Sequence, residues 1–277
     1  MRATSTLALL GLLSLPLAVQ AQTTPIADSV YLVKGATLAA TPMAAWKKGD
    51  AIESASGDAA KKAPRKAVRY AAKLVPWPTA TVKELVFTKK GGGVLHPITD
   101  EKTVFVLSGS VAATVDGKPV TLAAGDLASL PSGALTNAGK PADAVVIAWT
   151  AQSLTPGATP AVVRGADVQP RNMGGLTLKR YEFPGNSVRV AAQSKGFKTA
   201  PNSAKTDSLI RMTKGPARFF QNGQEFTAEE GDFIREVAGL QHNWECPEDS
   251  GFVTTSALPV GAGPIDASKA TDIPPAK

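Results

Sequence analysis

The hydrophobic positions of the chain fall in short runs that end near turn residues. Val104–Leu107 and Leu209–Met212 are apolar stretches followed within three residues by a glycine, a pattern typical of strands. Downstream, Asp116-Gly117 and Asn222-Gly223 each separate two strand-like runs. These dipeptides supply the positive φ angles that a type I′ hairpin turn needs. The pattern therefore predicts antiparallel β structure.

The same pattern occurs twice, with corresponding residues 106 positions apart and no gap between them. The matching pairs are Gly109 and Gly215, Gly125-Asp126 and Gly231-Asp232, Gly133 and Gly239, and Asn137 and Asn243. Ala144–Thr150 and Gly251–Ala257 would supply the last strand of each copy. Two copies of a unit with short strands and many turns predict two β-barrels or sandwiches in tandem.

Composition agrees with this picture. The chain has 277 residues of which 43% are hydrophobic, too many for an intrinsically disordered protein. Its 25 glycines and 21 prolines favour turns, and hence β structure over long helices. The single cysteine, Cys246, excludes a disulfide scaffold and is expected to be a small buried hydrophobic residue.

The first residues have the features of a secretory signal peptide. Arg2 is followed by an apolar stretch from Leu7 to Leu17, and Val19-Gln20-Ala21 is a small-residue cleavage site. The apolar stretch is shorter than the roughly 20 residues that span a bilayer, so no transmembrane segment is expected. The sequence predicts a periplasmic or secreted protein cleaved near Ala21, with an uncleaved anchor as the alternative.

Residues 59–73 contain six basic residues and no acidic one, within a chain of net charge +7. The basic residues are Lys61, Lys62, Arg65, Lys66, Arg69 and Lys73. Such a run can bind anionic glycans, lipid headgroups or nucleic acid, or it can simply be a solvated segment. Because Tyr70 is the one aromatic residue in the run, no nucleic-acid partner is expected.

Two motifs in the first copy resemble those of the cupin superfamily. The first begins at His96, reaches Lys102 and continues after six residues to Gly109. The second runs from Gly125 through Pro131-Ser132-Gly133, with Thr136 three positions after Gly133. The resemblance implies an all-β fold of two tandem jelly-roll β-barrels, the arrangement called a bicupin, behind the signal peptide and a basic extension.

The expected organisation has five parts. They are a signal peptide at 1–21, an N-terminal extension at 22–79, the first barrel at 80–155, a linker with the second barrel at 156–260, and a flexible tail at 261–277.

The resemblance also implies where a metal ion would bind, since many cupins hold one with three histidines and a glutamate. The corresponding residues are His96, Ile98, Lys102 and Thr136 in the first barrel, and Asn202, Ala204, Ser208 and His242 in the second. Each barrel thus keeps one histidine. Glu101 and Asp207 lie one residue from the glutamate position, and a one-residue shift along a strand turns a side chain to the opposite face.

No metal or other cofactor is therefore expected. If a divalent transition metal such as Mn, Fe, Ni, Cu or Zn is bound, Asn202, Asp207 and His242 form the better set of ligands.

Two functions are consistent with this sequence. The first is binding of a small anionic molecule, such as a sugar acid or an aromatic acid, inside a barrel. The candidate ligand-binding residues are His96, Lys102, Thr136, Asn202, Asp207 and His242. The alternative is an enzyme: a metal-dependent dioxygenase, decarboxylase or isomerase with an atypical site, or a metal-free isomerase that uses one histidine. Catalytic residues stay unassigned, and a homodimer is compatible with the way cupin barrels often pair.

Overall fold

A computed structural model describes most of the repeated region and parts of the chain before it. The described residues are 26–38, 41–44, 69–78, 80–87, 95–98, 103–115, 118–130, 133–136, 143–151, 161–183 and 186–257. The predicted signal peptide, most of the basic run 59–73 and the predicted tail from 261 lie outside them. In this part of the chain the strands form four antiparallel sheets, and the one helical element is the 3-10 turn η1 (Gly35–Thr37). The all-β prediction is confirmed.

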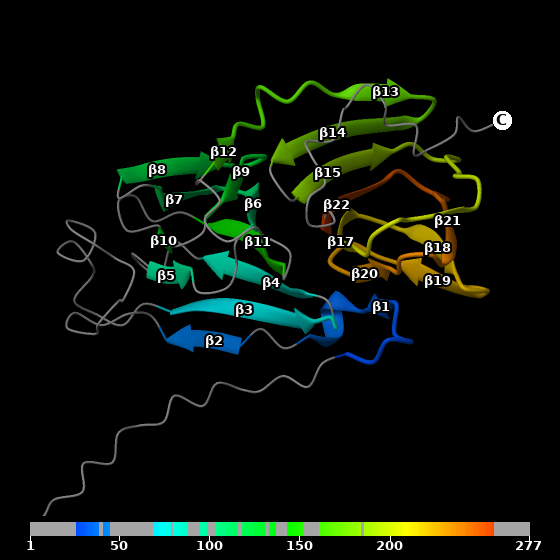
Figure 1. The fold of residues 1–277 in the computed structure, drawn as a ribbon, viewed down its shortest axis with the longest axis horizontal. Coiled ribbons are helices and arrows are strands. Elements are labelled where there is room, and N and C mark those ends of the chain that lie inside the picture. Colours follow the sequence, from blue (N-terminus) through cyan, green and yellow to red (C-terminus); the bar gives the residue numbers. More distant parts are fainter. Residues whose placement is uncertain are drawn as a thin grey trace, which may run out of the picture.

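The first unit consists of a seven-stranded and a four-stranded sheet (Figure 1). The larger sheet has the order β12 (Ala161–Val163), β9 (Leu127–Ser129), β6 (Thr103–Ser108), β11 (Ala144–Ala151), β4 (Ala80–Phe87), β3 (Arg69–Pro76) and β2 (Thr41–Ala44). The smaller one has the order β5 (Leu95–Ile98), β10 (Gly133–Thr136), β7 (Ser110–Val115) and β8 (Lys118–Ala123).

The second unit repeats this arrangement. Its larger sheet has the order β1 (Leu32–Val33), β20 (Phe233–Glu236), β17 (Ser208–Lys214), β22 (Ser250–Ala257), β15 (Asn186–Gln193), β14 (Leu176–Phe183) and β13 (Arg171–Met173). Its smaller sheet has the order β16 (Asn202–Ser203), β21 (Gln241–Glu245), β18 (Ala217–Gln221) and β19 (Gln224–Ala228). The two sheets of a unit are separate hydrogen-bonded ladders over the described strands.

The second predicted hairpin turn has the expected backbone. Asn222 and Gly223 join β18 to β19 with φ angles of 52° and 75°. In the first unit β7 pairs with β8 up to Val115 and Lys118, on either side of the undescribed Asp116-Gly117. No helix in the described segments is long and apolar enough to cross a bilayer.

The repeat extends further towards the N-terminus than the sequence analysis placed it. Strand β3, assigned to the extension at 22–79, pairs with β4 in the first unit just as β14 pairs with β15 in the second. Lys73 on β3 and Lys179 on β14 are 106 positions apart, and their ammonium groups donate to the Gly35 and Gly165 carbonyls. Part of the extension is therefore an integral strand of the first unit.

The two units exchange their leading strands. Strand β1 precedes the first unit in sequence but pairs with β20 of the second. Strand β12 precedes the second unit but pairs with β9 of the first. Each short strand thus lies at the edge of the other unit's sheet, and the chain interlocks its two halves.

A buried aspartate fixes each exchanged strand. Asp232 accepts hydrogen bonds from the Lys34 ammonium at 2.7 Å and the Gly35 amide at 2.9 Å. Asp126 accepts from the Arg164 guanidinium at 2.6 Å and the Gly165 amide at 2.9 Å. We call these the two clasps. They are related by the repeat, because the two aspartates are 106 positions apart.

Each clasp also requires a glycine. A Cβ atom at Gly35 would collide with the Gly231 carbonyl, and one at Gly165 with the Gly125 carbonyl. The close approach of the two backbones explains why glycine follows the basic residue at both places.

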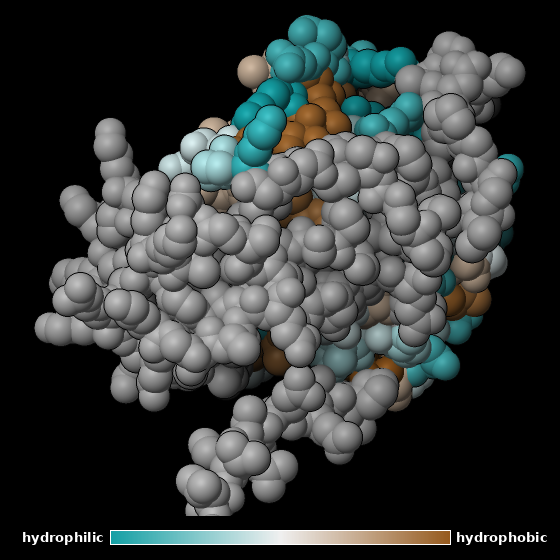
Figure 2. All heavy atoms as spheres, turned by 60° about the vertical axis from the view of Figure 1, so that its left-hand side comes forward, coloured by the Kyte–Doolittle hydropathy of each residue, from teal (hydrophilic) through white to brown (hydrophobic). Residues whose placement is uncertain are grey.

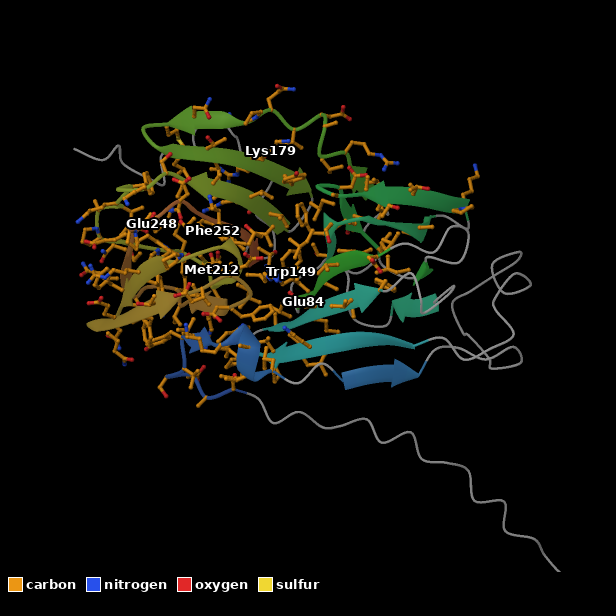
Figure 3. The ribbon with its side chains drawn as sticks, turned by 180° about the vertical axis from the view of Figure 1, so that it is seen from behind. Glu84, Trp149, Lys179, Met212, Glu248 and Phe252 are labelled. Carbon is orange, nitrogen blue, oxygen red and sulfur yellow. The ribbon has the colours of Figure 1, made fainter. Side chains whose placement is uncertain are left out.

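The outer faces of the two large sheets pack against each other and form a shared hydrophobic core. Repeat-related residues meet there, including the pairs Val82 and Val188, Leu127 and Phe233, and Ile147 and Val253. Trp149 lies in this layer, and the nearby Glu84 forms a 2.8 Å ion pair with Arg211 of the second unit (Figure 3). The outer faces are therefore occupied by packing.

The Asp126 clasp should stabilise the fold in a pH-dependent way. Burial raises the pKa of Asp126, but hydrogen bonds from Ala123, Gly165 and Arg164 outweigh it and hold the pKa below its ordinary 3.8. The stabilisation is then complete above pH 3.8 and is lost as the pH falls through the lowered value. Asp126→Asn should lower the free energy of unfolding by about 1–3 kcal/mol at pH 7, measured by urea titration.

The control for this measurement is Asp167→Asn, which changes an exposed aspartate beside the same clasp. It should stay within about 0.5 kcal/mol of the wild type. Equal losses in both variants would contradict a special role for Asp126.

Tyr181 should make the fold sensitive to alkali. Its hydroxyl donates to the Gly125 carbonyl at 2.8 Å, and burial together with the charge of Asp126 raises its pKa to about 12. The stabilisation from this hydrogen bond is complete at pH values below the ordinary tyrosine pKa of 10, and it is lost as the pH rises through about 12. Tyr181→Phe should cost about 1 kcal/mol at pH 7 and flatten the fall in melting temperature between pH 10 and 12. An unchanged alkaline profile would refute this.

Candidate functional site

The interior of the second unit lies between its two sheets. One wall of it is the face of the large sheet that packs against the small sheet. Met212 on β17 and Phe252 on β22 mark this face, since they pack with Phe219 and Trp244 of the small sheet. Side chains alternate along a strand and share a face with the residue directly opposite on the next strand. The strand register therefore identifies the remaining residues of the large sheet whose side chains face the interior.

Two neighbouring rows on this face are polar. The arginine row consists of Arg180 on β14, Arg189 on β15 and Thr254 on β22. The hydroxyl row crosses five strands and consists of Glu182, Ser187, Ser256, Ser208 and Glu236. A charged and hydroxylated lining inside a β-sandwich is unusual, because burial of polar groups costs free energy unless they are hydrogen-bonded.

Several polar atoms of these rows are buried without a hydrogen-bond partner among the described residues. They are Ser187 Oγ and Thr254 Oγ1, together with Arg180 Nε and Glu182 Oε1, which form an ion pair with each other at 2.9 Å outside hydrogen-bond geometry. Ser187 is 1% exposed and Thr254 is 4% exposed. Ser208 and Ser256, in contrast, hydrogen-bond each other at 2.9 Å. Each unsatisfied buried group costs about 1–3 kcal/mol, so this lining is suited to a polar ligand or to water.

His242 lies on the facing sheet, at the Glu236 end of the hydroxyl row. Its imidazole is buried, with Nδ1 3.3 Å from the Leu240 carbonyl and Nε2 3.6 Å from Glu236 Oε1. The same oxygen of Glu236 accepts a 2.8 Å hydrogen bond from the Trp244 indole. Nδ1 thus lies within hydrogen-bond distance of a backbone carbonyl, and Nε2 lies close to a carboxylate.

Aromatic rings line the interior next to His242. Phe219 lies 4.8 Å from Trp244 and 6.2 Å from His242 between ring centroids, and Trp244 stacks on Phe252 at 5.4 Å. The sequence analysis did not single out Glu236, because it occupies no motif position of the family.

The structure brings Asn202 and His242 together. They are directly opposite each other on β16 and β21, and the Asn202 amide donates to the Ala200 carbonyl at 3.1 Å. Asp207 is engaged elsewhere, because one carboxylate oxygen binds the Arg235 guanidinium at 2.8 Å and the other accepts from the Ala238 amide at 2.9 Å.

The residues of the second unit fit a metal ion poorly. Of its four family ligand positions, Ala204 has no donor atom and Ser208 is hydrogen-bonded to Ser256. No group of three or more His, Cys, Asp or Glu side chains that could hold an ion occurs among the residues described. Protein sites for such ions generally use three or more nitrogen, sulfur or carboxylate ligands.

The histidine of the first unit, His96, lies on the small sheet of that unit and not on the sheet that carries His242. His96 on β5 is opposite Leu135, and Thr136 on β10 is opposite Leu95. The two histidines of the chain therefore belong to separate four-stranded sheets. Lys102 lies outside the described residues.

The interior of the first unit is mainly apolar where it is described. Its core contains Ala72, Leu85, Val104, Val146 and Ala148, among others. The repeat aligns Leu74, Lys83 and Ala148 with the arginine row of the second unit, and Pro76, Thr81 and Leu130 with Glu182, Ser187 and Glu236. The two remaining positions of the hydroxyl row, Ser256 and Ser208, align with Thr150 and Lys102. The hydroxyl row therefore keeps polar residues at three of five positions in the first copy, whereas the arginine row keeps only Lys83.

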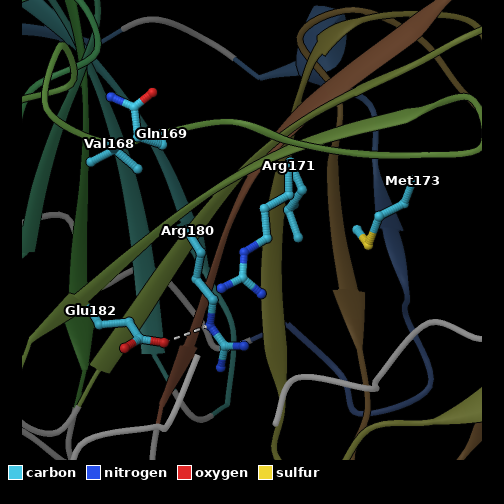
Figure 4. A pocket seen from close by; sticks show the side chains of 7 residues that line it. Val168, Gln169, Arg171, Met173, Arg180 and Glu182 are labelled. Carbon is cyan, nitrogen blue, oxygen red and sulfur yellow. Dashed lines mark ion pairs between the residues drawn. The ribbon is translucent and has the colours of Figure 1, made fainter. Parts of the chain in front are cut away.

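A cavity of about 340 Å³ opens at the β14 end of the polar rows (Figure 4). It is lined by Val168, Gln169, Arg171, Met173, Leu178, Arg180 and Glu182. Arg180 Nε lies 2.9 Å from Glu182 Oε1, the ion pair drawn in the figure. Met173 is one of two large hydrophobic side chains exposed among the described residues. Near the top of Figure 2, hydrophobic atoms lie between hydrophilic side chains on the described part of this face.

Cys246 is not arranged for nucleophilic chemistry. It is 2% exposed, as predicted, and burial raises the pKa of its thiol, which also accepts a 3.1 Å hydrogen bond from Ser250. A nucleophilic cysteine needs a lowered pKa.

Comparison with known proteins supports the fold. Residues 78–154 match the family described as EutQ-like cupin domain. No curated protein sequence matches the chain.

Three solved structures illustrate the structural likeness. AerE from Microcystis aeruginosa is 11% identical with a TM-score of 0.58, over 69% of this chain and 93% of its own. Salicylate 1,2-dioxygenase from Pseudaminobacter salicylatoxidans is 13% identical with a TM-score of 0.53, over 67% and 76%. A mutant of oxalate decarboxylase from Bacillus subtilis is 11% identical with a TM-score of 0.58, over 85% and 79%. At such identities the likeness concerns the fold alone.

Restoring the missing ligands should create a metal site in the second unit. We expect the wild type to hold no stoichiometric transition metal, and the triple variant Asn202→His, Ala204→His, Ser208→Glu to bind one Mn²⁺ per chain beside His242. Elemental analysis after dialysis measures both. The matched control replaces the same three residues with glutamine. Stoichiometric metal in the wild type, lost on His242→Ala, would overturn the expectation.

Proposed function

The chain is a member of the cupin superfamily, and we propose that its second unit binds a small carboxylic acid without a protein-bound metal ion. The observation that carries this proposal is the lining of the interior, where the buried hydroxyl groups of Ser187 and Thr254 lack hydrogen-bond partners among the described residues and Arg180 is ion-paired with Glu182. A bound polar molecule would satisfy them. The first unit, with a mainly apolar interior, would serve as a packed partner.

The charges of the site favour an acid. Arg180 and Arg189 are neighbours across β14 and β15, and a guanidinium binds a carboxylate with two parallel hydrogen bonds. His242 and Asn202 would provide polar contacts at the other end, beside the ring of Trp244. The lining suits both a sugar acid and an aromatic acid, since it combines hydroxyl groups with aromatic rings.

The alternative is an enzyme that uses a metal ion, as a dioxygenase, decarboxylase or isomerase. It would need ligands at the family positions, and the residues there fit an ion poorly. Binding without metal is therefore the function that the site supports best.

We further propose that the protein is exported and cleaved near Ala21, on the basis of its first residues. N-terminal sequencing of the mature chain tests this. Pairing into a homodimer is also compatible with the fold, and light scattering would measure it.

A native acid should bind through the second unit. We expect a carboxylic acid to be released when protein purified from its host is denatured and the extract analysed by mass spectrometry. His242→Gln should reduce its affinity about tenfold, which corresponds to the loss of one charge-assisted hydrogen bond, measured by calorimetry. His96→Gln is the matched variant in the first unit, and it should leave the affinity unchanged if the acid binds in the second unit. A loss with His96→Gln and none with His242→Gln would place it in the first unit instead.

A further inference from the structure

The cavity between β13 and β14 lies apart from the family's ligand positions. Its described lining comes from these two strands and the segment just before them, whereas Asn202, Ser208 and His242 lie on β16, β17 and β21. We propose that this cavity binds an aromatic acid, with Arg180 holding the carboxylate and apolar side chains of the lining holding the ring. This inference rests on the proposed function and selects among the acids that it allows.

The cavity has the size and the composition of a small-molecule site. Its volume of about 340 Å³ lies near the lower end of the range of roughly 300–1,000 Å³ that is usual for such sites. These sites combine apolar walls with a few polar groups that orient the ligand. In this cavity Val168, Met173 and Leu178 supply apolar side chains, and the charged groups lie beside them.

Two arginines reach the cavity from neighbouring strands. Arg171 on β13 is directly opposite Leu178 on β14, and Arg180 follows Leu178 by two residues. The two arginines are therefore diagonal neighbours on one face of the sheet, close enough for long side chains to meet. Figure 4 shows both side chains extending in the same direction. A carboxylate beside them is attracted by both charges, and a guanidinium matches its geometry.

Arg180 has atoms available to a carboxylate although it is paired with Glu182. The pair joins Nε to Glu182 Oε1 at 2.9 Å, and Nε has almost no accessible surface. The side chain is nevertheless 12% exposed and lines the cavity, so its accessible surface belongs to the remaining atoms, which include the two terminal nitrogens. These nitrogens present parallel N–H donors, the arrangement that binds a carboxylate with two hydrogen bonds.

Glu182 opposes the binding of an acid. Its side chain is 27% exposed and lines the same cavity, so its negative charge repels a carboxylate that approaches Arg180. The described lining still has a net positive charge, because it contains two arginines and this one carboxylate. The first copy has Leu74 and Pro76 at the positions of Arg180 and Glu182, so it lacks both charges.

The rest of the lining favours a ring over a sugar. Met173 is 38% exposed, and a ring placed over it would remove apolar surface from water. No hydroxyl group occurs among the described lining residues, and Gln169 is the neutral polar one. The hydroxyl groups of a sugar would lose hydrogen bonds to water there without gaining enough partners, whereas an aromatic ring has none to lose.

Calorimetry on the full chain with four probes tests the proposal. Benzoate and phenylacetate supply a carboxylate and a ring, benzyl alcohol lacks the carboxylate, and D-glucuronate replaces the ring with a hydroxylated body. We expect at least one of the two aromatic acids to bind at least tenfold more tightly than benzyl alcohol and glucuronate. Equal or tighter binding of glucuronate would overturn the choice of an aromatic acid, and equal binding of benzyl alcohol would overturn the role of the carboxylate.

Three substitutions test the assignment of residues. Arg180→Gln should weaken binding of the aromatic acid at least tenfold, and Met173→Gln should weaken it severalfold. Glu182→Gln should strengthen it severalfold, because the repelling carboxylate is removed, and this gain cannot result from loss of folding. The control for Met173 is Val30→Gln, since Val30 is the other exposed large hydrophobic residue of the described segments and lies outside the cavity lining. The control for Arg180 is Arg218→Gln, at an ion-paired arginine of the small sheet. Both controls should leave binding unchanged.

The outcomes separate this inference from the proposed function. Acid binding that depends on His242 but not on Arg180 or Met173 would overturn the inference and leave the proposed function standing. Absence of binding of both aromatic acids to the wild type and to Glu182→Gln would also overturn the inference. If glucuronate fails to bind as well, and the denatured protein releases no acid, the proposed function is overturned with it.

Discussion

The two clasps are the constraint on which the rest of the structure depends. Each buried aspartate collects a cation and a backbone amide from the strand that leads into the other unit. Because the exchange is reciprocal, neither unit completes its large sheet without the other. The interlocked sheets then pack through their outer faces, where repeat-related hydrophobic residues meet. The faces left for binding a small molecule are the two interiors.

The two interiors differ in their side chains although the strands around them correspond. The same strands, registers and clasps recur in both units, yet the second interior carries Arg180, Thr254 and the Glu236–His242 pair where the first copy has Leu74, Ala148 and Leu130 at the positions of Arg180, Thr254 and Glu236. An apolar interior stabilises a fold by itself, whereas unsatisfied polar groups reduce stability. The proposed acid would offset part of this cost in the second unit.

The sequence was sufficient for the all-β class, the tandem repeat and the Asn222-Gly223 turn, because glycine spacing and turn chemistry are local signals. It also pointed to His242 and Asn202, which the structure places opposite each other, while their role in binding stays a prediction. The polar rows escaped detection because they join residues from five strands, and only the register shows which of them share a face. A comparison of the two copies could have found them, since Arg180 and Thr254 align with Leu74 and Ala148.

The exchange of strands also explains how residues near the N-terminus affect the second unit. Tyr31 packs into the core of that unit, and Asp28 forms a 3.0 Å ion pair with the buried Arg235. Arg235 in turn holds Asp207, whose other oxygen fixes the Ala238 amide just before the turn into β21. This chain of contacts connects the N-terminal segment to the residues just before β17 and to those just before β21, the strand that carries His242. The segment that sequence analysis treated as an extension therefore docks on the second unit, and Tyr31 packs in the same hydrophobic cluster as Phe219 and Trp244.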